Sequence, residues 1–112
     1  MSRSRATARS FDPVPAFAAL GDRTRLTLVR RLSNGEPSSI ASLSDDTDMT
    51  RQAVTKHLRV LERAGLVRCA RVGRETQFVL EAKTLGQLCE YLDTVSKQWD
   101  AALSRLRTFV ED

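Results

Sequence analysis

Apolar residues in the middle of the chain recur at the spacing of a helix. Val54, Leu58 and Leu61 are four and then three positions apart, so they share one face and can seat a helix on a small core. The other face of this stretch is polar and basic, and its side chains suit the phosphates and base edges of duplex DNA. The candidate DNA contacts on this helix, expected over 50–64, are Thr50, Arg51, Gln52, Thr55, Lys56, His57 and Arg59.

Shorter helical patterns come before this basic helix. Residues 11–20 hold two prolines ahead of an Ala-rich run, which is typical of a helix with proline in its first turn. Asp22 is a good N-cap for the next helix, and Asn34-Gly35 supplies its C-terminal stop. The apolar face of that second helix is expected to comprise Leu26 and Val29, with Leu28 and Leu32 as further candidates.

A third short helix is expected after Pro37, capped by Ser38 or Ser39. Its core residues would be Ile40, Ala41 and Leu43. The polar segment 44–50 follows, and Met49 is expected to fill the angle between the third helix and the basic one. Together these features form the helix-turn-helix pattern over about 38–65. The acids of the connector are expected to face away from DNA, because carboxylates repel phosphates; they are Asp45, Asp46 and Asp48.

The periodicity changes after Gly65. Segments 66–72 and 75–80 are rich in β-branched and aromatic residues on either side of Gly73-Arg74, which predicts a β-hairpin with a two-residue type II′ turn. Arg71 and Arg74 then lie near the hairpin tip. They could be ordinary surface residues, but a position beside the basic helix favours contact with phosphates or the minor groove. A basic hairpin in this place is a wing, here over 66–80.

The last helix, expected over 82–111, has the most regular apolar pattern of the chain, with steps of three and four. These seam positions are Leu85, Leu88, Leu92, Val95, Trp99, Ala102, Leu106 and Phe109. The seam could pack along its own domain, but a helix about 40 Å long outruns so small a core, which favours pairing with a second copy of the chain. The residues predicted to make this dimer contact are Phe17, Leu85, Leu88, Leu92, Val95, Trp99 and Leu106.

The composition fits one domain with an anionic partner. The 112 residues, 41% of them apolar, suffice for a single core over 11–112. The net charge of +4 is concentrated on 1–10, with three arginines and no acid, and on 50–75, with seven basic and two acidic residues. Residues 1–10 are expected to be a disordered basic arm, although a transit peptide has a similar composition. Because no run of 18 apolar residues occurs, we expect a soluble, cytoplasmic protein with no membrane partner.

Four segments together carry a resemblance to a known family. They are residues 17–26 (FAALGDRTRL), 51–61 (RQAVTKHLRVL), 62–67 (ERAGLV) and 72–75 (VGRE). In this order they resemble the ArsR family of small bacterial winged-helix repressors, closely over 11–80 and by pattern alone in the last helix. The resemblance implies a mainly α-helical winged helix-turn-helix fold with a small β-hairpin and a long C-terminal dimerisation helix. It also implies a homodimer that binds a two-fold symmetric operator and represses until a signal weakens its binding to DNA.

The chain departs from the metal-sensing members of that family. Some of those members carry a Cys-rich motif on the third helix, where this chain has Ser39-Ile-Ala-Ser-Leu-Ser44. Others bind zinc through Asp and His on the last helix, but residues 81–112 contain no histidine. The resemblance is therefore to the metal-independent branch, and neither a metal nor a cofactor is predicted. His57, the only histidine, could be a half-buried core residue, but we favour contact with phosphate or DNA backbone.

Other function classes find less support. The single histidine lacks a partnered nucleophile or carboxylate motif and no phosphate loop is present, which argues against an enzyme. Cys69 and Cys89 are too few for a disulfide scaffold and are expected to be reduced, half-buried thiols, although a redox switch stays open. We predict a homodimeric repressor that binds double-stranded DNA at the bacterial nucleoid. The alternative is a dimeric winged-helix protein-interaction module that does not bind DNA.

Overall fold

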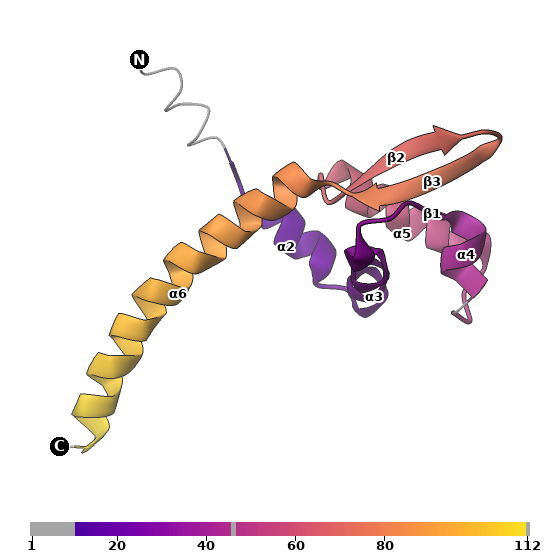
Figure 1. Ribbon diagram of the computed structural model, residues 1–112. Coiled ribbons are helices and arrows are strands. Elements are labelled where there is room, and N and C mark those ends of the chain that lie inside the picture. The colour runs from indigo at the N-terminus through magenta and orange to yellow at the C-terminus, as the bar shows by residue number, and fades with distance from the viewer. Residues whose placement is uncertain (1–10, 46, 112) are drawn as a thin grey trace, which may run out of the picture.

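The computed structural model describes residues 11–45 and 47–111. The predicted basic arm, residues 1–10, and Asp46 lie outside the described residues. Helices α2, α3, α4 and α5 form a small helical body, a narrow sheet lies against it, and the long helix α6 leaves this body at an angle (Figure 1). The chain is therefore mainly α-helical with a small sheet, which confirms the predicted fold class.

The first two helices begin and end as the sequence indicates. Helix α2 spans Val14–Leu20 with proline in its first turn, and α3 spans Arg23–Arg31. Asp22 caps α3, because its Oδ2 accepts a hydrogen bond from the backbone N–H of Arg25 at 3.1 Å. A 3-10 turn, η1, continues over Leu32–Asn34 and stops at Gly35, whose φ of +82° is a left-handed conformation suited to glycine.

The apolar face of α3 differs in one position from the sequence prediction. Leu28 and Leu32 are completely buried, and Val29 packs against the core. Leu26, which was expected on this face, is 42% exposed. The prediction for Leu26 was wrong because α3 is covered mainly on the side that turns towards α5 and α2, and the spacing of apolar residues alone does not identify that side.

Helices α4 and α5 form the helix-turn-helix. Helix α4 spans Ile40–Asp45 and α5 spans Arg51–Arg63. Met49 is half-buried and packs against the core, as predicted for the residue between these helices. Thr50 caps α5, because its Oγ1 accepts a hydrogen bond from the backbone N–H of Ala53 at 3.0 Å.

The sheet has one strand more than the sequence predicted. Strand β2 (Val67–Val72) and strand β3 (Glu75–Leu80) form the predicted antiparallel hairpin, with Val72 opposite Glu75 across the turn. Gly73 has a φ of +61°, and no other residue type among those described has a positive φ, which fits the type II′ turn. The short strand β1 (Ser38–Ser39) pairs with the other edge of β3, giving the order β1-β3-β2. Ser39 still caps the start of α4, since its Oγ accepts a hydrogen bond from the backbone N–H of Ser42 at 3.1 Å.

One core holds the helices and the sheet together. Its largest fully buried side chains are Phe78, Leu28, Leu32, Leu58, Leu61, Leu66 and Val54. Helix α6 spans Ala82–Glu111 and joins this core only at its start, where Leu88 is buried and Leu85 is partly buried. No helix in the described part of the chain is long and apolar enough to cross a membrane.

Candidate nucleic-acid interface

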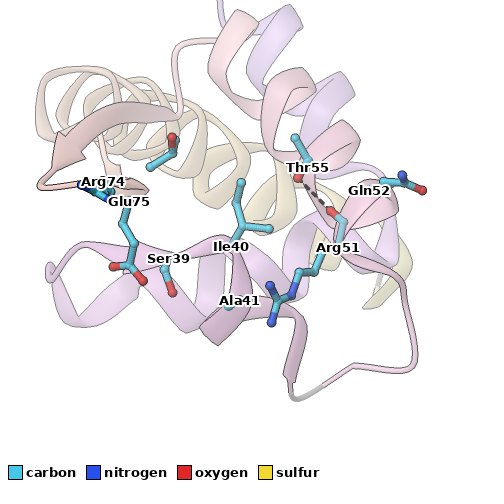
Figure 2. A pocket seen from close by; sticks show the side chains of 9 residues that line it. Ser39, Ile40, Ala41, Arg51, Gln52, Thr55, Arg74 and Glu75 are labelled. Carbon is cyan, nitrogen blue, oxygen red and sulfur yellow. Dashed lines mark hydrogen bonds between the residues drawn. The ribbon is translucent and has the colours of Figure 1, made fainter.

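An open hollow lies where the start of α5 faces the tip of the wing. Its walls come from three regions that are far apart in the sequence: β1 with the start of α4, the first turns of α5, and the turn and start of β3 (Figure 2). Its volume is about 560 Å³, and it is lined by Ser39, Ile40, Ala41, Arg51, Gln52, Thr55, Arg74, Glu75 and Thr76. Folding therefore gathers four of the predicted DNA contacts, three from α5 and one from the wing, around one depression.

The polar face of α5 is exposed because the opposite, apolar face is packed against the core. The residues that seat it, all fully buried, are Val54, Leu58 and Leu61. On the other side, Arg51, Gln52 and Lys56 are exposed. Thr55 is half-buried, and its hydroxyl donates a hydrogen bond to the backbone carbonyl of Arg51 at 2.7 Å (Figure 2). This arrangement leaves long cationic side chains and one amide free to reach outward.

Most cations of this surface have no counter-ion inside the subunit. Among the residues that the structure describes, those without an ion pair on α5 and the wing include Arg51, Lys56, Arg71 and Arg74. Arg68, by contrast, pairs with Glu81 at 3.2 Å. Glu75 is the one acid that lines the hollow, and its Oε1 accepts a hydrogen bond from the side-chain amide of Gln77 at 3.1 Å. The uncompensated charge is positive, which suits a polyanion.

Arg59 is held by its own subunit. Its Nη1 donates to Oε1 of Glu62 at 2.9 Å, and its guanidinium lies 5.3 Å from the centre of the Phe78 ring, within the range of a cation–π contact. The hydrogen bond to Glu62, followed by a contact with the thiol of Cys69, raises the pKa of Arg59 above its ordinary value. DNA contact by Arg59 stays a prediction, and it would use the guanidinium donors that Glu62 leaves free.

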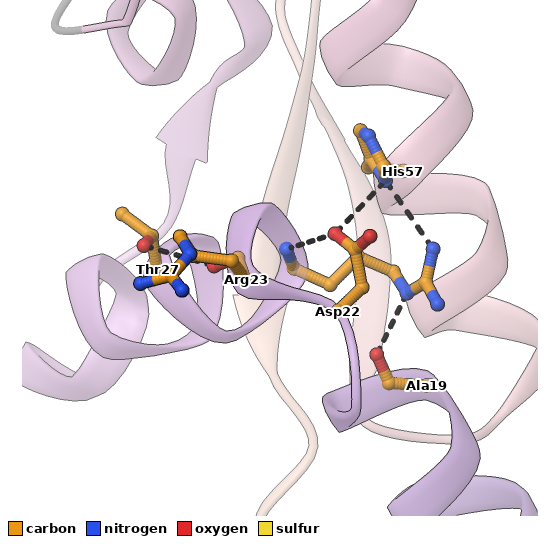
Figure 3. A network of polar contacts seen from close by, with 6 residues as sticks. Ala19, Asp22, Arg23, Thr27 and His57 are labelled. Atoms are coloured by element: carbon orange, nitrogen blue, oxygen red, sulfur yellow. Dashed lines mark hydrogen bonds and ion pairs between the residues drawn. The ribbon is translucent and has the colours of Figure 1, made fainter.

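His57 lies on the side of α5 that faces the start of α3. Its side chain is half-buried, with Nδ1 at 3.4 Å from Nη1 of Arg25 and 3.9 Å from Oδ2 of Asp22 (Figure 3). His57 is thus partly packed within the helical body, which agrees with the first of its two interpretations, a half-buried core residue. Contact with phosphate stays a prediction, and Nε2 is the ring atom left to make it.

The acids of the connector lie apart from the hollow. Asp45 and Asp48 are exposed. Asp48 lines a different depression, together with Met49 and the residues of α3 from Arg23 to Leu28 that face it. The structure therefore places Asp48 beside α3 and not among the cations of α5 and the wing.

A second feature, the exposed apolar surface of α6, lies at the other end of the molecule. Leu92, Trp99 and Leu106 are 48%, 64% and 57% exposed. Phe17 of α2 is partly exposed as well, and its ring lies 6.0 Å from that of Tyr91. Leu88 is only 5% exposed, so its side chain is already used inside its own subunit. The other residues of the predicted dimer contact stay a prediction.

Neither a metal-binding cluster nor a disulfide occurs among the described residues. They contain no group of three His, Cys, Asp or Glu side chains that could hold a metal ion. Cys69 and Cys89 are both free thiols. Cys69 is half-buried as expected, whereas Cys89 is exposed, because it lies on the side of α6 that faces away from the core.

A helix-turn-helix whose second helix presents an exposed basic face, followed by a β-hairpin whose tip meets that face, defines a winged helix-turn-helix protein. Residues 20–70 match the family model of a helix-turn-helix domain. The chain is 36% identical over 92 residues to the HTH-type transcriptional regulator Rv2034 of Mycobacterium tuberculosis. The matched region covers 82% of each of the two chains. The chain is also 31% identical to a solved ArsR-like transcriptional regulator from Rhodococcus sp. RHA1. It therefore belongs to the ArsR family of winged helix-turn-helix transcriptional regulators, which are DNA-binding proteins and not enzymes.

Solved structures agree with this assignment. An ArsR-like transcriptional regulator from Rhodococcus sp. RHA1 superposes with a TM-score of 0.69 at 31% identity, covering 86% of this chain and 90% of that one. The homodimeric winged helix-turn-helix DNA-binding domain Mb0332 from Mycobacterium bovis superposes with a TM-score of 0.62 at 16% identity, covering 87% and 85%. The second likeness concerns the fold alone.

The sequence did not predict two features of this interface: the contribution of β1 to the hollow, and the contact of Arg25 with His57. Ser39 and Thr76 line the hollow because β1 pairs with β3, and a two-residue strand carries no alternation that could have indicated it. Arg25 contacts His57 from 32 positions away in the chain. The N-cap Asp22 was visible in the sequence, but nothing local to α3 indicates which helix Arg25 would reach.

Proposed function

We propose that the protein is a homodimeric repressor that binds a palindromic operator. Helix α5 of each subunit enters the major groove, and the wing lies on the flanking backbone. As a regulator bound to DNA, it acts at the bacterial nucleoid. A signal that weakens DNA binding lifts repression, and neither a metal nor a cofactor is needed for the DNA-bound state.

The observation that carries this proposal is the hollow shared by α5 and the wing. Arg51, Gln52 and Thr55 line it from the helix and Arg74 from the hairpin. The major groove, about 12 Å wide, admits a helix, and a side-chain amide such as that of Gln52 can pair with an adenine edge through two hydrogen bonds. Arginines at the periphery bind phosphates and fix the position of the helix in the groove. Both kinds of contact are available on one exposed surface.

Dimerisation is supported by the exposed side chains of α6. A stripe that includes Leu92, Trp99 and Leu106 faces solvent in the single subunit, and such a continuous apolar surface usually marks an association site. With 30 residues, α6 is about 45 Å long, and most of it extends beyond the core. A winged helix-turn-helix domain of the same fold, Mb0332, is a homodimer. Two copies paired along α6 by a two-fold axis would present two α5 helices to one side of DNA.

Repression requires no protein surface other than the one that binds DNA. An operator that overlaps a promoter is closed to RNA polymerase by the volume of the bound dimer. A dimer with two-fold symmetry recognises half-sites about 34–36 Å apart, one turn of B-DNA, so the operator is an imperfect palindrome.

The test begins with selection of duplexes by the purified full-length chain from a random-sequence DNA pool. We expect an enriched sequence with two inverted half-sites. Affinity for it should fall with rising salt, with a slope of about −0.9 per phosphate engaged in a plot of log affinity against log salt. A protein-interaction module would enrich no sequence, and a flat salt response would contradict the phosphate contacts. A reporter gene behind the selected operator then distinguishes a repressor, which lowers expression, from an activator.

A further inference from the structure

A polar network joins helices α2, α3 and α5, and its central residue, Arg25, is not among the predicted DNA contacts. Arg25, in the first turn of α3, donates from Nε to the backbone carbonyl of Ala19 at 2.7 Å. Its Nη1 lies 3.4 Å from Nδ1 of His57 on α5 (Figure 3). The same residue donates its backbone N–H to Asp22, whose Oδ2 is 3.9 Å from Nδ1 of His57. One guanidinium therefore bridges the end of α2 and the middle of α5.

We propose that Arg25 is a positioning residue for the DNA-binding helix: it fixes α5, through the ring of His57, to the last turn of α2. This inference rests on the proposed function, because it concerns how the DNA-contacting surface is held. Arg25 lines the groove between α2 and the end of α5 rather than the hollow at the start of α5 and the wing tip, and it is not among the predicted DNA contacts.

The nearer of the two groups that face Nδ1 favours one tautomer of His57. The guanidinium of Arg25 lies 3.4 Å from Nδ1, within hydrogen-bond distance, whereas the carboxylate of Asp22, which could only accept, lies 3.9 Å away. A guanidinium has donors and no acceptor, so Nδ1 of a neutral imidazole facing it must be the acceptor. The ring hydrogen then lies on Nε2, the atom that is left to donate to a phosphate. Arg25 thus holds His57 in the tautomer that an anion contact requires.

The far end of the network leads to the dimer surface. Ala19 accepts from Arg25 in the last turn of α2, and Phe17 of the same helix lies 6.0 Å from Tyr91 of α6, ring centre to ring centre. Figure 1 shows α2 between α6 and α3. An arginine that fixes α5 to α2 therefore fixes the angle of α5 to the helix that pairs the subunits, and this angle sets the distance between the two DNA-contacting helices.

Arg23 offers a matched control. It lies two positions before Arg25 on α3, is exposed, and among the described residues its side chain has no hydrogen bond or ion pair. Arg25→Met and Arg23→Met remove the same charge from the same helix turn, but only Arg25→Met removes the network. Arg25→Lys keeps the charge, yet a single ammonium lacks the fork that reaches two acceptors in different directions.

The first measurement needs no DNA. The chain has one histidine, so the ring nitrogens in a ¹⁵N spectrum belong to His57 alone. We expect the wild type and Arg23→Met to show the Nε2–H tautomer, and Arg25→Met to shift both ring nitrogens towards the values of a tautomer mixture. Identical spectra for wild type and Arg25→Met would overturn the proposal. Should Arg25→Met fail to fold, as judged by circular dichroism, Arg25→Lys replaces it.

The second measurement uses the duplex that the wild type selects, together with versions that have one base pair more or fewer between the half-sites. We expect Arg25→Met to bind the selected duplex about tenfold more weakly or worse, the loss typical of one hydrogen bond to a charged group, and to discriminate spacing less than the wild type. Arg23→Met should keep both properties. Full spacing discrimination in Arg25→Met, or equal losses in both variants, would overturn the proposal. If the wild type selects no duplex, the proposed function fails, while the spectra still decide whether Arg25 holds His57.

Discussion

Gln52 and Arg74 line the same hollow but differ in what they can offer to DNA. The amide of Gln52 is both donor and acceptor and lies on the helix that enters the groove, whereas Arg74 is a cation at the wing tip. We expect Gln52→Ala to cost about 1–3 kcal/mol of binding to the selected duplex and to relax preference at one base pair. Arg74→Ala should weaken binding to every sequence alike. Fluorescence anisotropy with selected and scrambled duplexes measures both effects.

The two variants serve as controls for each other. Both remove one side chain from the same surface, so a loss of fold would affect both kinds of DNA in either variant. Equal losses on selected and scrambled DNA in Gln52→Ala would remove Gln52 from base recognition.

A second residue-scale prediction concerns Asp22 and pH. The hydrogen bond from the backbone N–H of Arg25, helped by the charges of Arg25 and His57, lowers the pKa of Asp22 below its ordinary value of 3.8. A carboxyl group whose pKa is lower in the folded than in the unfolded chain stabilises the fold fully above the unfolded value. That stabilisation is lost as the pH falls through the lower, folded value.

Asp22→Asn isolates this effect, because asparagine is as good an N-cap but does not titrate. Urea unfolding of both proteins at about pH 6, 4 and 3 should show the wild type losing more stability over this interval than Asp22→Asn. A difference between the two proteins that stays constant across the interval would contradict the lowered pKa of Asp22.

At the scale of the elements, two exposed glycines should respond to alanine with opposite signs. A Cβ added at Gly73 or Gly86 meets nothing within 4 Å, so packing is not at issue in either case. Gly73 has a φ of +61° in the wing turn, where alanine is strained, and we expect Gly73→Ala to lower the free energy of unfolding by about 1 kcal/mol. Gly86 lies inside α6, and we expect Gly86→Ala to raise the free energy of unfolding by about 0.5–1 kcal/mol, because alanine is the better helix former. Denaturant unfolding measures both, and a stabilised Gly73→Ala would argue against the type II′ turn.

The elements themselves differ in how far the sequence could predict them. Helices α3 and α5 were predictable from Asp22 and Thr50, because a cap acts on backbone groups within the next three residues. The hairpin turn was predictable because Gly73 supplies a conformation that other residues avoid. Strand β1 was not predictable, because its two serines pair with β3 some 40 positions further along the chain.

At the scale of the whole molecule, the proposal depends on pairing of α6. Leu92→Asp together with Val95→Asp places two carboxylates where the apolar seam would be buried, and an unpaired buried charge costs several kcal/mol. We expect this double variant to sediment as a monomer, and to bind the selected duplex far more weakly because only one half-site is engaged at a time.

The matched control is Ala101→Asp with Ser104→Asp, which adds the same charge to α6 at exposed positions outside the predicted seam. This control should remain a dimer. A dimer that persists in Leu92→Asp with Val95→Asp would refute α6 as the subunit contact.

The sequence by itself determined where the helices and the wing begin and end, and which face of α5 is polar. These properties depend on periodicity, caps and turn residues, which act between residues a few positions apart. Four of the residues that it predicted as DNA contacts line one hollow: Arg51, Gln52, Thr55 and Arg74. The nature of this surface, a basic face with one amide, was therefore predictable from the residues alone.

Only the tertiary structure decided how those elements use their side chains. It placed Arg59 over the ring of Phe78, brought Arg25 to His57, and buried the start of α6 against the core while leaving its longer part exposed. The pattern along α6 is uniform, so it could not indicate where the core ends. Contacts between residues far apart in the chain depend on how the elements pack together, and no local pattern records that arrangement.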